Sequence, residues 1–259
     1  MTDSASEFNR AIHRAANLLK GSRRTVALTG AGISTPSGIP DFRSQGSGLW
    51  TRYEPMEVAS LTAFRCHPEK FFAWFHPLAR QMVLADPNPA HLALARLEGA
   101  GYIKTVITQN IDGLHSRAGS GNVLELHGTL SSLTCTNCFQ HYDSAHFLED
   151  YLEHGTIPLC PSCGQILKPD VILYEEQLPY RVWQDAEEAS RSCDLMLIAG
   201  TSLEVMPSAG LPIRAIENGA HLILVNRTAT YMDVRADVIF HKDVADVIPL
   251  IADEVLSPH

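Results

Sequence analysis

The sequence predicts an α/β fold: a doubly wound, parallel, Rossmann-like sheet with a smaller inserted domain. Short apolar runs alternate with helical stretches along the chain, and the runs end in polar clusters that contain Gly or Asn. Alternating strands and helices favour a parallel sheet, whose ligands bind beyond the carboxyl ends of its strands. We therefore expect the polar clusters to line one crevice.

The predicted strands are short and apolar, which is typical of strands buried on both faces of a sheet. They cover residues 25–29, 104–108, 195–199 and 222–225, and a further apolar run covers 124–126. Apolar residues at helical spacing predict helices between the strands. These helices cover residues 4–20, 91–98 and 181–190.

Two segments interrupt the alternation. Residues 36–86 are rich in Pro, Phe and Trp without strand signals, and residues 130–169 hold four cysteines. We predict a cofactor loop and helical insert at 36–86 and a metal-binding insert at 130–169. The remaining residues, 1–35, 87–129 and 170–259, are predicted to form the Rossmann-like domain.

The composition restricts the class of protein. With 259 residues, the chain fits one full-sized domain with a small insert. Its formal net charge of -9 disfavours direct nucleic-acid binding, which needs a basic face. We expect no signal peptide, because the first residues lack a basic stretch and an apolar core, and no membrane partner, because no apolar run is long enough to span a bilayer. Six cysteines in such a chain predict a reducing, cytoplasmic location, with Cys66 and Cys193 as buried apolar residues.

Two CxxC pairs predict a metal site. Cys135 pairs with Cys138 and Cys160 with Cys163, close to the usual spacing for a four-thiolate zinc site. Four thiolates complete a tetrahedral shell and leave no position for water, so the zinc is expected to be structural. A redox pair or a fortuitous set of buried cysteines is the alternative.

The turn Gly30-Ala31-Gly32-Ile33-Ser34 follows the first strand and is similar to a dinucleotide turn, in which glycines let the backbone approach a pyrophosphate. The third glycine of the oxidoreductase fingerprint is missing, and no acidic residue follows at the ribose-binding position. Hydride transfer is therefore disfavoured. Glycines in such a turn can also be required by the backbone conformation alone, without any bound dinucleotide.

Polar side chains follow two further apolar runs. Gln109, Asn110 and Asp112 come directly after residues 104–108, where they can orient ribose hydroxyls and a carboxamide or act as turn and capping residues. His127 follows the run at 124–126. An isolated histidine is more often structural, but a near-neutral pKa makes His127 the best general-base candidate in the crevice.

Together these features resemble the sirtuin family of NAD-dependent protein deacylases, from about Arg24 to Ala245. The segment from Gly30 to Arg43 matches the family's first motif along its length. The family's second motif is matched by Thr108-Gln109-Asn110-Ile111-Asp112 and its third motif by His127-Gly128. The two CxxC pairs match its zinc module. Its later nucleotide-contacting motifs are matched by Gly200-Thr201-Ser202 and Val225-Asn226.

The resemblance implies an enzyme that uses NAD as co-substrate, contains one structural zinc ion and removes acyl groups, expected to be acetyl, from lysines of protein partners. The acyl oxygen would attack C1′ of the nicotinamide ribose and release nicotinamide. His127 would then draw a proton from the ribose hydroxyls, so that the acyl group moves onto ADP-ribose. His127 and Asn110 are the implied catalytic residues. The implied cofactor contacts are Gly30, Ala31, Gly32, Ser34, Thr35, Asp41, Phe42, Arg43, Gln109, Asn110, Ile111, Asp112, His127, Gly200, Thr201, Ser202, Asn226, Arg227, Asp243 and Val244.

The chain departs from the family at Glu175, which stands where Tyr174-Glu175-Glu176 replaces the usual Phe-Gly-Glu. That stretch ordinarily lends its backbone to a substrate peptide. Glu175 is therefore either a tolerated surface substitution or a group that favours peptides with basic residues near the acylated lysine. Phe75 and Leu78 align loosely with the Tyr and Arg that read acidic acyl chains in some sirtuins, so no charge partner for succinyl is expected.

Two other functions fit the same fold: a mono-ADP-ribosyltransferase, and a non-catalytic module that senses NAD. The joint presence of Asn110, Asp112 and His127 favours the deacylase.

Overall fold

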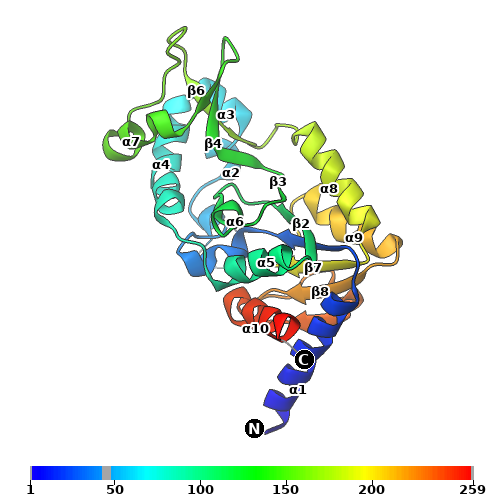
Figure 1. Cartoon of the computed structure of the whole chain (residues 1–259). Coiled ribbons are helices and arrows are strands. Elements are labelled where there is room, and N and C mark those ends of the chain that lie inside the picture. The colour runs from blue at the N-terminus through cyan, green and yellow to red at the C-terminus, as the bar shows by residue number, and fades with distance from the viewer. Residues whose placement is uncertain (1, 43–47, 258–259) are drawn as a thin grey trace.

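Six parallel strands form the main sheet, in the order β3-β2-β1-β7-β8-β9 (Figure 1). The computed structural model of the chain describes residues 2–42 and 48–257, with side chains from Ser6 onward. The strands are β1 Thr25–Thr29, β2 Ile103–Thr108, β3 Val123–Glu125, β7 Leu195–Ala199, β8 His221–Val225 and β9 Val238–Phe240.

The central strands are buried on both faces. In β1, Leu28 lies beside Ile107 of β2 and Ile198 of β7. Val26 and Leu28 enter one hydrophobic core, whereas Ala27 between them enters the other. Alternation of side chains across a strand buried on both faces explains the continuous apolar runs in the sequence.

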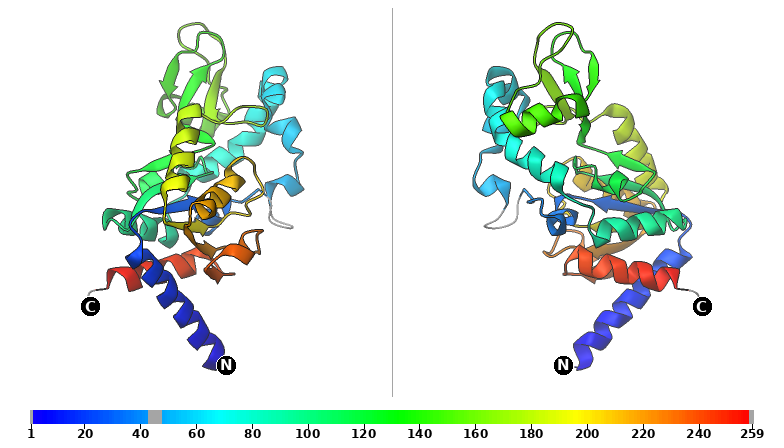
Figure 2. Two further views of the ribbon diagram at one scale, coloured as in Figure 1. Left: turned by 90° about the vertical axis from the view of Figure 1, so that its right-hand side faces the viewer. Right: turned by 60° about the vertical axis from the view of Figure 1, so that its left-hand side comes forward.

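Helices cover both faces of this sheet (Figure 2). On one face α1 Thr2–Gly21, α5 Pro89–Gly99 and α10 Val244–Leu256 share one core, and on the other face α8 Tyr180–Ser192 and α9 Leu211–Glu217 share the second. The amino-terminal part of α1 extends away from the body in all views. No helix within the described ranges is long and apolar enough to cross a membrane.

A smaller module lies beyond the carboxyl ends of the strands (Figure 1). It combines a three-stranded antiparallel sheet in the order β5-β4-β6 with helices that share an aromatic core, in which Phe71, Phe75 and Tyr151 are buried. Its elements are α2 Pro55–Val58, α3 Leu61–Cys66, α4 Pro68–Leu84, β4 Gly128–Cys135, β5 His141–Asp143, α7 Ala145–His154 and β6 Leu167–Val171, and the short α6 Leu114–Arg117 lies between β2 and β3.

The predicted fold class is confirmed, and each predicted strand and helix is present within a few residues of its expected ends. Strand β9 was not predicted. The expectation that Cys66 is buried is wrong, because Cys66 is exposed at the end of α3, whereas Cys193 is buried. The division into domains at residues 35, 86, 129 and 169 stays a prediction.

Two histidines are buried under the carboxyl end of β1 and β2. His91 of α5 and His115 of α6 are almost fully buried, with ring centroids 4.8 Å apart. Thr29 donates its hydroxyl proton to Thr108 (2.9 Å), so His115 Nε2 donates to Thr29 Oγ1 (2.9 Å). Burial lowers the pKa of His91 to about 4, against a smaller opposite effect of Asp112. Burial, and then the charge of His91, lower the pKa of His115 to about 3.

We expect the fold to lose stability as the pH falls below about 6.5. The folded-state pKa of each histidine is lower than its unfolded-state value, so the unfolded chain binds protons first. His91 alone then lowers the free energy of unfolding by about 2 kcal/mol between pH 6.5 and pH 5. Urea denaturation of the unmutated protein and of His91→Gln at both pH values measures this, because glutamine keeps a capping group but does not titrate. An equal loss of unfolding free energy in the unmutated protein and in His91→Gln would contradict the prediction. His154→Gln, at an exposed position, is the control.

Candidate functional site

A cleft of about 960 Å³ lies between the carboxyl edge of the main sheet and the smaller module. This volume is at the upper end of the range for ligand sites. Every cofactor-binding residue predicted from the sequence lines it, apart from Gly30 and Arg43. Gly30 lies behind the lining at the end of β1, where its amide donates to the Ala199 carbonyl (3.4 Å). Arg43 lies outside the described residues.

The glycine turn after β1 is shaped by contact with the loop after β7. The Gly32 amide donates to the Gly200 carbonyl at 2.8 Å. A Cβ on Gly32 would lie 2.8 Å from that oxygen, and a Cβ on Gly200, which has a φ of 62°, would lie 2.3 Å from the Ile33 nitrogen. Only glycine fits at both positions, so the two loops pack backbone to backbone.

Ser34, Asn110 and Asp112 form one hydrogen-bonded group on the cleft floor. Ser34 donates from Oγ to Asp112 Oδ2 (2.6 Å), and Asn110 Nδ2 donates to Ser34 Oγ (3.0 Å). Asp112 Oδ1 also accepts from the Leu114 amide (2.9 Å) at the start of α6. The side-chain amide of Asn110 offers a hydrogen-bond donor and the carboxylate of Asp112 an acceptor beside it. A carboxamide ligand needs both kinds of partner.

His127 lies in the short connection between β3 and β4, above this floor. Its Nδ1 is 2.9 Å from the Gln109 carbonyl oxygen, which can only accept, so Nδ1 carries the proton. In the neutral ring, Nε2 is then the basic nitrogen. The His127 carbonyl accepts from the Ile172 amide (2.8 Å), so both the ring and the backbone of this residue are held.

Gly128 lets the chain turn from His127 into β4. It has a φ of 77°, and a Cβ there would lie 1.9 Å from the Asp170 carbonyl oxygen of β6. No side chain is possible at this approach of β4 to β6. The glycine thereby fixes where the preceding histidine stands.

The far end of the cleft lies beyond β7 and β8. Gln109 Nε2 donates to Thr201 Oγ1 (3.1 Å), and Asn226 Nδ2 donates to the Thr228 carbonyl (2.8 Å). Arg227 forms an ion pair with Asp243, which also caps α10 by accepting from the Ala245 amide at 2.9 Å. These side chains are therefore held in place by contacts within the chain.

Several lining residues were not predicted as site residues. Thr228 and Lys242 are the sequence neighbours of the predicted Arg227 and Asp243. That adjacency was the signal in the sequence for these two residues. Trp50 and Trp74 also line the cleft, with stacked rings whose centroids are 5.9 Å apart. The sequence shows that residues 36–86 are rich in Trp and Phe, but composition cannot identify which of these rings line the cleft.

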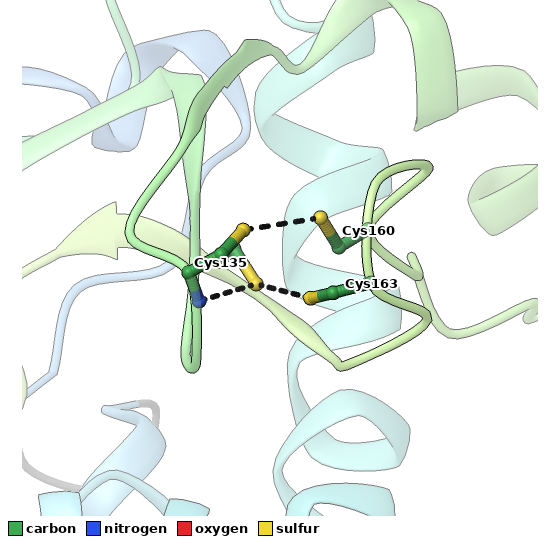
Figure 3. A group of neighbouring side chains, drawn as sticks. Cys135, Cys160 and Cys163 are labelled. Atoms are coloured by element: carbon green, nitrogen blue, oxygen red, sulfur yellow. Dashed lines mark hydrogen bonds between the residues drawn. The ribbon is translucent and has the colours of Figure 1, made fainter.

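The four cysteines of the CxxC pairs converge in the smaller module, where Figure 3 shows Cys135, Cys160 and Cys163 close to one another. The sulfur atoms of Cys135 and Cys163 are 3.4 Å apart, those of Cys138 and Cys160 are 3.6 Å apart, and all four lie within 4.8 Å of one another. Zinc–thiolate bonds of about 2.3 Å place sulfurs of a tetrahedral site roughly 3.8 Å apart. The cluster therefore fits a four-coordinate zinc ion, and none of these cysteines is in a disulfide.

Comparison with known proteins agrees with this geometry. Residues 30–207 match the model of the Sir2 family. The chain is 45% identical to an NAD-dependent protein deacylase of Archaeoglobus fulgidus, over 94% of this chain and 96% of the relative. It is 42% identical to an NAD-dependent protein deacetylase of Sulfolobus acidocaldarius, over 95% and 96% of the two chains.

Solved structures of Sir2 enzymes superpose closely. One, determined in work on their mechanism and regulation, has a TM-score of 0.89 and 44% identity, covering 95% of this chain and 98% of the other. A Sir2 variant in complex with a deacetylated p53 peptide and 3′-O-acetyl-ADP-ribose has a TM-score of 0.86 and 38% identity, covering 92% and 96%. The chain belongs to the Sir2 family, as its resemblance to sirtuins predicts.

Proposed function

We propose that this protein removes acyl groups from lysine side chains of proteins in an NAD-dependent reaction, with His127 as general base. The position of His127 carries the proposal: its protonated Nδ1 is bound to the Gln109 carbonyl, and its ring lines the cleft that also contains Asn110 and Asp112. The Archaeoglobus and Sulfolobus relatives are named as an NAD-dependent deacylase and deacetylase. Incubation with NAD and acyl-lysine peptides, followed by mass spectrometry of nicotinamide and acyl-ADP-ribose, tests it.

The cleft residues fit NAD. Bound there, NAD would supply a ribose with nicotinamide as leaving group. We assign the carboxamide end to Asn110 and Asp112, whose side chains offer a donor and an acceptor beside Ser34. The backbone of the glycine turn lines the cleft at Ala31 and Gly32, and we assign the pyrophosphate to it. Ser202 and Asn226, which line the far end of the cleft, are assigned to the adenosine half.

We assign one proton transfer to His127. Because Nδ1 donates to a carbonyl oxygen, the neutral ring presents Nε2 as proton acceptor. His127 Nε2 would accept the proton of a ribose hydroxyl of bound NAD, so that the hydroxyl oxygen could bond to the acyl carbon. The bond between the acyl carbon and the lysine nitrogen would then break, the lysine amine would leave, and one water would be consumed in forming acyl-ADP-ribose. A mono-ADP-ribosyltransferase would release nicotinamide without acyl-ADP-ribose, so the same mass spectrum separates the two activities.

We further propose that zinc bound by the four cysteines is structural. The thiolates fill all four positions of a tetrahedral ion, and the cluster belongs to the small core of β4, β5 and β6 rather than to the cleft. Thiolates that remain unpaired also favour a reducing compartment, and we propose a cytoplasmic location on that basis.

We expect His127→Ala to lower kcat for deacylation about 100-fold to 10,000-fold, because it removes the general base. Exchange of labelled nicotinamide into NAD should persist, since bond cleavage precedes this proton transfer. Acyl-ADP-ribose formation and nicotinamide exchange are measured in parallel. Near-normal acyl transfer by the variant would reject the assignment, and an unchanged Tm and zinc content would exclude misfolding.

Cys163→Ala is expected to lose zinc and to lower Tm, because metal binding contributes folding energy in such sites. Metal analysis should find one zinc per unmutated chain and far less in the variant. Cys66→Ala is the matched control, since Cys66 is an exposed cysteine outside the cluster. Active protein without bound zinc would contradict the prediction.

Neutral acyl groups should be preferred over succinyl by at least about 100-fold in kcat/KM, because burying an unpaired carboxylate is costly. Phe75 and Leu78 form an apolar part of the wall, and the described cations that line the cleft, Arg227 and Lys242, stand at its far end. Kinetics on matched acetyl- and succinyl-lysine peptides measure the ratio. Leu78→Arg should reduce the ratio whereas Leu78→Met should preserve it, and comparable rates on both peptides in the unmutated protein would refute the apolar-wall argument.

A further inference from the structure

The turn from Leu173 to Glu176 forms part of the cleft wall and is anchored to the three-stranded sheet through Glu176. The Glu176 amide donates to the Leu173 carbonyl (3.1 Å), and the Leu173 amide donates to Glu176 Oε2 (2.8 Å). The same carboxylate is paired with the half-buried Lys168 of β6 at 2.9 Å. One side of the turn is thus fixed.

The other side of the turn contacts the helical part of the smaller module. The Tyr174 amide donates to the Ala59 carbonyl (2.9 Å), and the Leu61 amide donates to the Tyr174 carbonyl (3.0 Å). One residue further on, Glu175 Oε2 accepts from the Thr62 amide (2.8 Å) in the first turn of α3. Glu175 therefore adds a side-chain contact to two backbone contacts.

Glu175 holds this contact from an unfavourable backbone conformation. Its φ is 74°, in the left-handed region where a residue with a side chain is strained and glycine is not. The glycine that the family resemblance implies at this position would avoid the strain. Hydrogen bonding by Thr62, and then the charge of Arg65, hold the pKa of Glu175 below its usual range, so the carboxylate is ionised at neutral pH.

We propose that Glu175 is a positioning residue: through Thr62 it fastens the 173–176 turn to α3 and so sets where this wall of the cleft meets the acyl-lysine peptide. The proposal rests on the proposed deacylase function and deepens it. Because the side chain acts through the turn, its loss should weaken peptide binding more than the chemical step.

This role differs from selection of basic peptides by the charge of Glu175, the hypothesis that the sequence raised. The observed contact engages one carboxylate oxygen with the chain itself. Glutamine retains an oxygen that can accept from the Thr62 amide but carries no charge. Glu175→Gln therefore separates the two roles, which removal of the whole side chain does not.

The experiment compares Glu175→Gln, Glu175→Ala and Glu175→Gly with the unmutated protein. Loss of the hydrogen bond in the Ala and Gly variants should raise the peptide KM about threefold to tenfold, with kcat and the KM for NAD nearly unchanged. Hydrogen exchange at the Thr62 amide should become faster in both. Gln should remain close to the unmutated protein in both measurements. Glu188→Gln, at an exposed position on α8, controls for the change in net charge.

Three results would overturn the proposal: unchanged Thr62 exchange in the Ala and Gly variants, faster exchange without a change in peptide KM, or a Gln variant that behaves like Ala. A loss of preference for basic over acidic peptides in all three variants would instead support charge selection. If the unmutated protein shows no NAD-dependent turnover, the proposed function fails. That result is distinct, because the Thr62 exchange measurement does not depend on activity.

Discussion

The cleft depends on the backbone contact between Gly32 and Gly200. The hydrogen bond between them joins the loop after β1 to the loop after β7, and neither position has room for a Cβ. With the loops after β1 and β7 joined in this way, both also contact the loop after β2, through Ser34 with Asp112 and through Thr201 with Gln109. A methyl group at either glycine would separate groups that lie on different strands.

His127 stands where the main sheet and the smaller module meet. Its ring is bound to the carbonyl that follows β2, and its backbone carbonyl is bound by the amide that follows β6. Gly128 allows β4 to pass against β6 at a distance that excludes any side chain. The orientation of the imidazole therefore depends on both parts of the chain, so the cysteine-bearing module contributes to the position of the proposed base although its cysteines lie away from the cleft.

Local patterns predicted much of this arrangement. Buried strands gave continuous apolar runs, and the CxxC spacing located the four cysteines that the structure brings together. The three-residue apolar run of β9 was missed, although β3 is equally short and was predicted. Cys66 was wrongly expected to be buried, because its exposure depends on which face of α3 packs against the rest of the chain. The pairing of Glu175 with Thr62 joins residues 113 positions apart, and no local pattern in one sequence contains such a contact.

The two walls of the cleft are held by interactions of different kinds. On the sheet side, Thr29 is hydrogen-bonded to both Thr108 and His115 in a buried group beneath Asn110. The backbone amide of Asn110 donates to Thr108 Oγ1 (3.1 Å). Breaking such a group leaves buried polar atoms unpaired, so substitutions there are costly. On the proposed peptide side, Glu175 is exposed, so loss of its contact with Thr62 leaves no buried polar atom unpaired and changes the wall without unfolding the sheet. The residues assigned to the cofactor are therefore constrained by the fold, whereas the wall assigned to the peptide can change at Glu175 without loss of the sheet.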